Sequence, residues 1–148
     1  MKRTICSILL LATAACSNKA ESKLRAVAER ANPVLIALRK PAAVILSPES
    51  APAQVVSACD AGISIAQHLR GLDLQDQNLG SDGALSVEDV LYGFSIEQTT
   101  RCNPDSEDGT HQARCVSWCR ERFGQLVDAV DRVRTQADKE GIKIEVLR

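Results

Sequence analysis

Four cysteines and one histidine are the residues of this chain best suited to chemistry. They are Cys59, Cys102, Cys115 and Cys119, with His111 four residues before Cys115. Residues four apart share one face of a helix, so His111, Cys115 and Cys119 would line one side of it. Thiolates and imidazole are zinc ligands, and Cys59 or Cys102 would supply a fourth. The same cysteines can instead form two disulfide bonds, which removes the thiolates that a metal needs.

We expect the disulfides, because the spacing matches no known zinc pattern and the N-terminus, described below, indicates export to an oxidising compartment. Four cysteines allow three pairings, and spacing alone does not choose among them. Cys115 and Cys119 would lie one helical turn apart with parallel side chains, a geometry that rarely forms a bond. We therefore favour Cys59–Cys119, between two core-facing positions, and Cys102–Cys115, which would pin a loop. Each bond should contribute roughly 2–4 kcal/mol to stability.

The polar loop around Asp82 is a second candidate site. The segment from Asn78 to Asp89 resembles half of an EF-hand calcium loop, with Asp82 and Asp89 at its fifth and twelfth positions. The match is incomplete, because Gly80 stands where an oxygen ligand belongs and Asp89 replaces the usual glutamate. The other interpretation is a turn at Asp82 followed by a helix that Ser86 and Asp89 cap together. We favour this turn and cap, and we expect no metal ion or cofactor.

Recognisable catalytic motifs are absent from the sequence. It has two histidines, His68 and His111, and neither lies in a known catalytic pattern. There is no G-x-S-x-G elbow, Walker loop, G-x-G-x-x-G, H-E-x-x-H or C-x-x-C-H motif. Adjacent acids such as Glu88 and Asp89 would point about 100° apart on a helix, so they build no acid–base pair. We expect a protein without enzymatic activity.

The first sixteen residues have the pattern of an export signal. A basic start precedes an apolar run at residues 4–15, which is too short for a membrane span of about 20 residues. Thr13-Ala14-Ala15-Cys16 resembles the lipobox of bacterial lipoproteins, with Thr13 where leucine is usual. The resemblance implies that residues 1–15 are a signal peptide, and that Cys16 becomes the first residue and carries lipid on its thiol.

Cysteine parity favours this cut. It removes Cys6 and assigns Cys16 to lipid, which leaves four cysteines for two disulfides. The alternative is an A-x-A cut after Ala14, which would release a soluble secreted or periplasmic protein of the inhibitor or immunity type with one unpaired thiol. Ser17 follows the cysteine in place of aspartate, which by the same resemblance implies the periplasmic side of the outer membrane. Residues 16–23 would then be a short polar tether.

Charge and composition argue against nucleic acid as a partner. The formal net charge is −1, and loss of Lys2 and Arg3 with the signal makes it −3. Binding to a polyanion needs a basic surplus, which this chain lacks. Aromatic residues make up 3% of the chain, so its core must be built mainly from alanine, valine, leucine and isoleucine.

Residues 24–148 are expected to form one all-α domain, a small disulfide-stapled bundle of about four helices with an extended C-terminal tail. Hydrophobic periodicity predicts helices over 21–46, 51–72, 87–98 and 110–139, with the second at the centre. The first should be broken at Asn32-Pro33 and again at Pro41. An α+β alternative pairs short strands at 42–46 and 142–147.

The predicted last helix has the most regular pattern. Apolar residues recur at heptad spacing over three repeats, and Gly141 should end the helix in a left-handed conformation. The positions of the stripe are Val116, Cys119, Phe123, Leu126, Val130, Val133 and Ala137.

These features together predict a membrane-anchored lipoprotein of the cell envelope that acts, without catalysis, as a protein-binding or structural module. Its partners would be the lipid bilayer, reached through acylated Cys16, and an envelope protein. The alternatives are a metal- or calcium-binding envelope protein and the soluble protein cut after Ala14.

Overall fold

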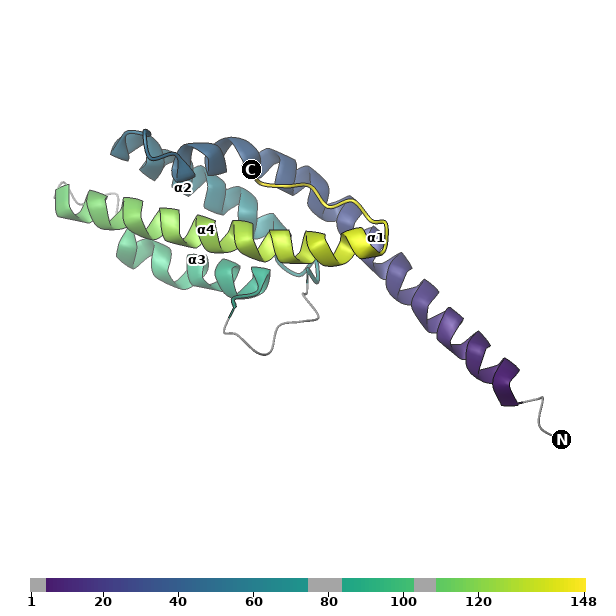
Figure 1. Cartoon of the computed structure of the whole chain (residues 1–148). Helices are drawn as coiled ribbons and strands as arrows, with labels where there is room; N and C mark the ends of the chain where they lie inside the picture. The colour runs from purple at the N-terminus through teal and green to yellow at the C-terminus, as the bar shows by residue number, and fades with distance from the viewer. Residues whose placement is uncertain (1–4, 75–83, 103–108) are drawn as a thin grey trace.

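The computed structural model describes residues 5–74, 84–102 and 109–148, with side chains described from Glu21 onward. Within these ranges the chain forms four α-helices and one short 3₁₀-helix, without a β-strand (Figure 1). The elements in order are α1 (Ile5–Leu46), α2 (Pro52–Ala66), η1 (Gln67–Leu69), α3 (Val87–Arg101) and α4 (Gly109–Lys139). The expected all-α, disulfide-stapled bundle is confirmed.

The α+β alternative is wrong. Residues 42–46 end α1, and residues 142–147 have an extended backbone that pairs with no strand in the described part of the chain. Ala42 and Ile45 are both fully buried, and their spacing of three fits a helix packed on the core. The tail is instead docked by its own apolar side chains, since Ile142, Ile144 and Leu147 are also buried.

Helix α1 is longer than expected and is not interrupted by its prolines. It begins at Ile5 rather than near residue 21, includes the expected tether at 16–23, and contains both Pro33 and Pro41. An internal proline destabilises a helix by about 3 kcal/mol. At Pro41 burial offsets this cost, because Pro41 and the neighbouring Leu38 lie in the core, whereas Pro33 is exposed. The expected helix start at Asn32 is wrong, because its side chain binds the C-terminal tail instead of capping a helix.

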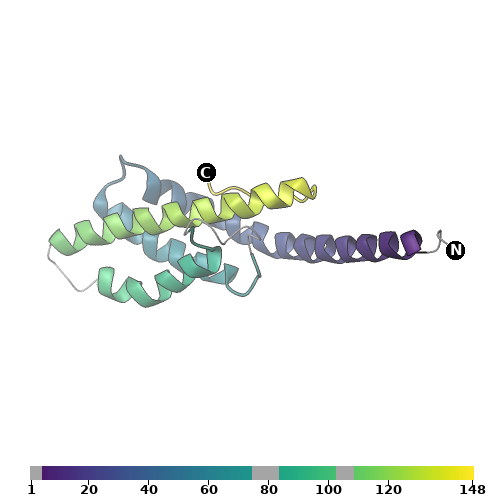
Figure 2. The same ribbon diagram turned by 60° about the horizontal axis from the view of Figure 1, so that its bottom comes forward.

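Helix α4, rather than α2, is the central element. It packs against α1, α2 and α3, and Figures 1 and 2 show α3 running alongside it. All seven positions of its predicted heptad stripe are buried, so that expectation is confirmed. The segment expected at the centre, α2, packs mainly against α1 and α4. It stops at Ala66, and positive φ angles at Gly71 (69°) and Asp73 (59°) turn the chain after η1.

The start of α3 and the ends of α3 and α4 test the sequence signals for where a helix begins and where it stops. Ser86 caps α3 at the expected place, but α3 continues to Arg101, three residues beyond the expected Gln98. Helix α4 ends at Lys139, as expected, and Gly141 has the left-handed φ of 67°. The Ile142 amide donates to the Ala137 carbonyl (3.0 Å), which closes a Schellman motif and directs the tail back toward α1.

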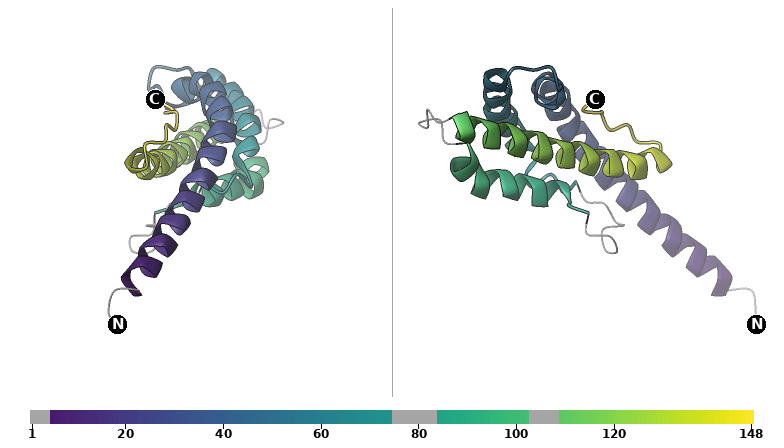
Figure 3. Two further views of the ribbon diagram at one scale, coloured as in Figure 1. Left: turned by 90° about the vertical axis from the view of Figure 1, so that its right-hand side faces the viewer. Right: turned by 60° about the vertical axis from the view of Figure 1, so that its left-hand side comes forward.

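The N-terminal part of α1 projects away from the rest of the bundle, as both views in Figure 3 show. Val27 is the first residue whose side chain is described as buried. In the described part of the chain, no helix combines the length and the hydropathy that crossing a membrane requires.

Candidate functional site

Two disulfide bonds hold the centre of the bundle together. Cys59 of α2 is bonded to Cys119 of α4, with alpha carbons 6.0 Å apart. Cys102, directly after α3, is bonded to Cys115 of α4, with alpha carbons 4.7 Å apart. These are the two pairs favoured from the sequence. Both bonds end on α4, so they fasten α2 and the end of α3 to the same central helix.

The four sulfurs form one cluster. The Cys119 sulfur lies 3.8 Å from the sulfurs of both Cys102 and Cys115. The sulfurs of Cys59, Cys102 and Cys119 lie within 4.8 Å of one another. A metal ion would need thiolates here, and in this structure every one of these sulfurs is in a disulfide. Among the described residues, His111 joins no group of side chains close enough to share a metal, so the candidate metal set of His111, Cys115 and Cys119, which was weighed against the expected disulfides, is not assembled.

The calcium candidate can be followed only at Asp89, because Asn78 and Asp82 lie outside the described residues. The Asp89 carboxylate accepts hydrogen bonds from the Ser86 hydroxyl (2.6 Å) and the Ser86 amide (2.9 Å). In return, the Asp89 amide donates to the Ser86 hydroxyl (3.1 Å). The hydrogen bonds from Ser86, its hydroxyl first, lower the pKa of Asp89. Asp89 thus forms the capping box that was the favoured interpretation of this motif.

A polar network between α3 and α4 was not predicted from the sequence. Glu97 of α3 accepts a hydrogen bond from the indole nitrogen of Trp118 (2.9 Å) and pairs with the guanidinium of Arg122. Arg122 crosses α3 directly above Gly93, where an added β-carbon would lie 3.2 Å from the guanidinium carbon. Sequence could not reveal this network, because it depends on how α3 is positioned along α4.

A pocket of about 340 Å³ opens beside this network. Its lining combines three arginines, Arg101, Arg114 and Arg122, with two acids, Glu97 and Glu121. The remaining lining residues are Ser117 and Trp118. No histidine or cysteine lies in this described lining, which offers guanidinium groups, carboxylates and one hydroxyl.

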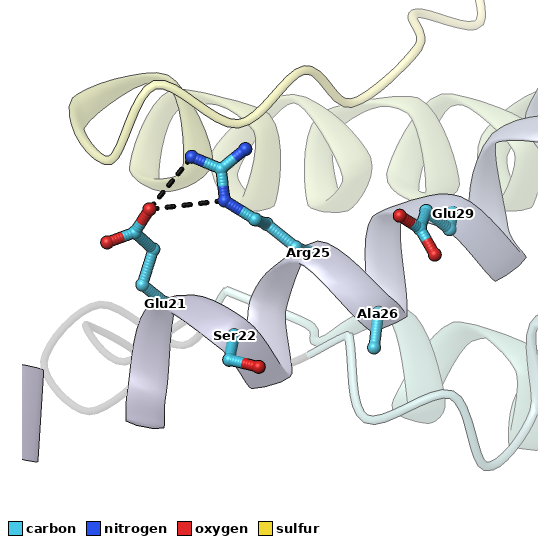
Figure 4. A pocket seen from close by; sticks show the side chains of 5 residues that line it. All are labelled: Glu21, Ser22, Arg25, Ala26 and Glu29. Atoms are coloured by element: carbon cyan, nitrogen blue, oxygen red, sulfur yellow. Dashed lines mark hydrogen bonds and ion pairs between the residues drawn. The ribbon is translucent and has the colours of Figure 1, made fainter. Parts of the chain in front are cut away.

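A second pocket lies on the projecting part of α1 (Figure 4). All five lining residues belong to one helix face: Glu21, Ser22, Arg25, Ala26 and Glu29. Arg25 donates to the Glu21 carboxylate from two guanidinium nitrogens, at 3.1 and 2.8 Å. Exposed pairs four residues apart contribute only about 0.3–0.5 kcal/mol. This surface is a solvated helix face, because four of its five lining residues are exposed.

No family model matches the chain, and comparison with curated proteins and with solved structures finds no significant similarity.

Replacing Glu97 with alanine should lower the free energy of unfolding by about 1–3 kcal/mol, because the Trp118 indole and the Arg122 guanidinium both lose a partner. Urea unfolding followed by fluorescence measures this directly, since Trp118 is the single tryptophan of the chain. Glu121→Ala is the matched control, because Glu121 is an exposed acid of the same pocket. Equal effects of the two substitutions would show that the network contributes nothing.

Proposed function

We propose that this chain is a lipoprotein of the bacterial cell envelope. In this proposal the chain is cut before Cys16, the thiol of Cys16 carries a diacylglycerol, and the helical bundle acts as a non-catalytic binding or structural module on the periplasmic side of the outer membrane.

The observation that carries the proposal is the use of cysteines. The structure places Cys59, Cys102, Cys115 and Cys119 in two disulfides. Removal of the signal peptide before Cys16 leaves Cys16 as a fifth cysteine, without a disulfide partner. Before removal, residues 13–16 resemble a lipobox. An unpaired thiol in an oxidising compartment needs another fate, and lipidation supplies one.

The geometry of α1 is compatible with an anchor at this end. Cys16 and Val27, the first position described as buried, lie eleven positions apart. At 1.5 Å per residue a helix of that length spans about 16 Å. Lipid on Cys16 would therefore hold the body off the membrane surface on a helical stalk, and leave the faces of the bundle accessible to a partner.

Replacing Cys16 with serine should abolish the incorporation of radioactive palmitate in a bacterial host, because the acyl-accepting thiol is gone. Cys6→Ser is the matched control and should retain the label, since Cys6 leaves with the signal peptide. Labelling of the Cys16→Ser protein, or no labelling of the unaltered chain, would contradict the proposal and favour a soluble protein cut after Ala14.

A further inference from the structure

The C-terminal tail lies on α1 in the manner of a bound peptide. After the reversal at Gly141 it runs back along α1 (Figures 1 and 3). Ile142 and Ile144, at alternate positions, are 4% and 2% exposed, and Leu147 is 3% exposed. An extended chain presents alternate side chains to the same side, so Ile142 and Ile144 serve as apolar anchors.

Asn32 of α1 forms hydrogen bonds with the main chain of the tail on both sides of Ile144. Its side-chain amide donates to the Lys143 carbonyl (3.0 Å) and accepts from the Glu145 amide (2.9 Å). A neighbouring β-strand would satisfy the same two groups in a sheet. Because these contacts are to main-chain atoms, they recognise an extended conformation and not particular side chains.

Arg39, seven residues further along α1, favours an acidic side chain at the position of Glu145 in the tail. Its Nε donates to the Val146 carbonyl (2.9 Å), and its guanidinium pairs with the Glu145 carboxylate. Hydrogen bonds from Lys143 and then from Arg39 lower the pKa of Glu145. Asn32 and Arg39 together define what we call the tail-binding face of α1.

The main chain of the tail depends on Asn32 and Arg39 for its hydrogen bonds. Beyond Ile142, no hydrogen bond joins its main chain to another main-chain group in the described part of the molecule. Asn32 also precedes a proline inside a helix, an arrangement that local helix preferences disfavour. Such local conflicts in otherwise consistent sequences tend to mark functional positions. Here the conflict coincides with the residue that binds the peptide main chain.

We propose that the tail-binding face of α1 is a recognition site for an extended segment of a partner protein, with aliphatic residues at alternate positions followed by an acid. The chain's own tail is the resident competitor of that segment. This inference deepens the proposed role as a binding module and names the chemistry of its partner. A covalently attached competitor acts at an effective concentration in the millimolar range. The partner segment must therefore bind tightly enough to displace the tail, or bind when the tail has already dissociated.

The test uses the full-length, disulfide-bonded chain with Ile144→Asp. This substitution places a charge at a buried apolar position and should release the tail without shortening it. The probe is a fluorescent peptide of residues 140–148, measured by anisotropy. We expect saturable binding at least about tenfold tighter to the Ile144→Asp chain than to the unaltered chain, whose site is occupied. Adding Asn32→Ala should weaken binding about tenfold, through loss of two hydrogen bonds.

Two controls test the specificity of this binding. Arg30→Ala, two residues from Asn32 and therefore on the opposite side of α1, should leave peptide affinity unchanged. A peptide that itself carries Ile144→Asp should not bind. No saturable binding to a folded Ile144→Asp chain, or equal binding of the altered peptide, would overturn the proposal.

A second measurement applies if the Ile144→Asp chain does not fold. Excess peptide is added to the unaltered chain, and hydrogen exchange is followed at its Glu145 amide, which donates to Asn32. Displacement of the tail should accelerate exchange at this amide, and no acceleration at saturating peptide would overturn the proposal. Neither measurement involves lipid, so each can fail while palmitate labelling of Cys16 succeeds, and the reverse.

Discussion

Replacing Cys59 and Cys119 together with alanine should lower the free energy of unfolding by about 4 kcal/mol. The bond closes a loop of 60 residues, and in the chain-entropy model a loop of that length restricts the unfolded chain by about this amount. Both partners must be replaced, because a lone Cys119 thiol would lie 3.8 Å from two sulfurs of the other disulfide and could exchange with it. Denaturant unfolding without reductant measures the change.

The second disulfide is the matched control for this prediction. Cys102 and Cys115 are only 13 positions apart in the sequence, so their joint replacement should reduce stability by about 3 kcal/mol on the same model. The prediction is therefore a ranking as well as a magnitude. A larger loss for the Cys102–Cys115 pair would show that native packing, not loop length, decides the contribution of each bond.

Substituting alanine for Gly62 should destabilise the bundle by about 1–3 kcal/mol, although alanine favours a helix over glycine by about 1 kcal/mol. A β-carbon at this position would lie 2.6 Å from the Phe123 ring and 3.4 Å from the Pro41 side chain. Phe123 is fully buried and packs against Phe94, with ring centroids 5.2 Å apart, so it cannot move aside without disturbing the core. Thermal or urea unfolding gives the free-energy change.

Gly124 provides the matched control for Gly62. It also lies inside a helix, but an added β-carbon there would meet nothing within 4 Å. Gly124→Ala should therefore stabilise the protein by about 0.5–1 kcal/mol through helix propensity alone. Replacing the Phe123 ring with a smaller side chain, by Phe123→Leu in the Gly62→Ala protein, should recover part of the lost stability. Stabilisation by Gly62→Ala similar to that by Gly124→Ala would contradict the clash.

The proposed lipid anchor and the proposed tail-binding face belong to the same helix, α1. In the proposed protein, Cys16 attaches one end of this helix to the membrane, while Asn32 and Arg39 lie on the part that packs on the body. A partner segment captured there would be held near the membrane surface without any enzymatic step. Palmitate labelling and peptide binding test the two halves of this arrangement separately.

Several features of the fold could be predicted from local sequence patterns. The heptad stripe of α4, its stop at Gly141 and the Ser86 cap of α3 each depend on residues within a few positions of one another. The disulfide pairing could also be ranked, because Cys115 and Cys119 share a helix face and cannot easily bond to each other. Such features follow from helix geometry and need no knowledge of how the helices pack.

Tertiary packing decided the rest. Local rules predicted that Asn32-Pro33 would begin a helix, but α1 continues through it, with Ala31 and Leu35 fully buried on either side and Asn32 bound to the tail. Contacts such as Trp118 with Glu97, Arg122 above Gly93 and Phe123 against Gly62 join residues 21 to 61 positions apart. They depend on the register between helices, which helical periodicity leaves open because each apolar stripe repeats every turn. The sequence by itself therefore determined which face of α4 is buried and which four cysteines are left to pair, whereas only the tertiary structure decided which residues meet across the helices and where the tail binds.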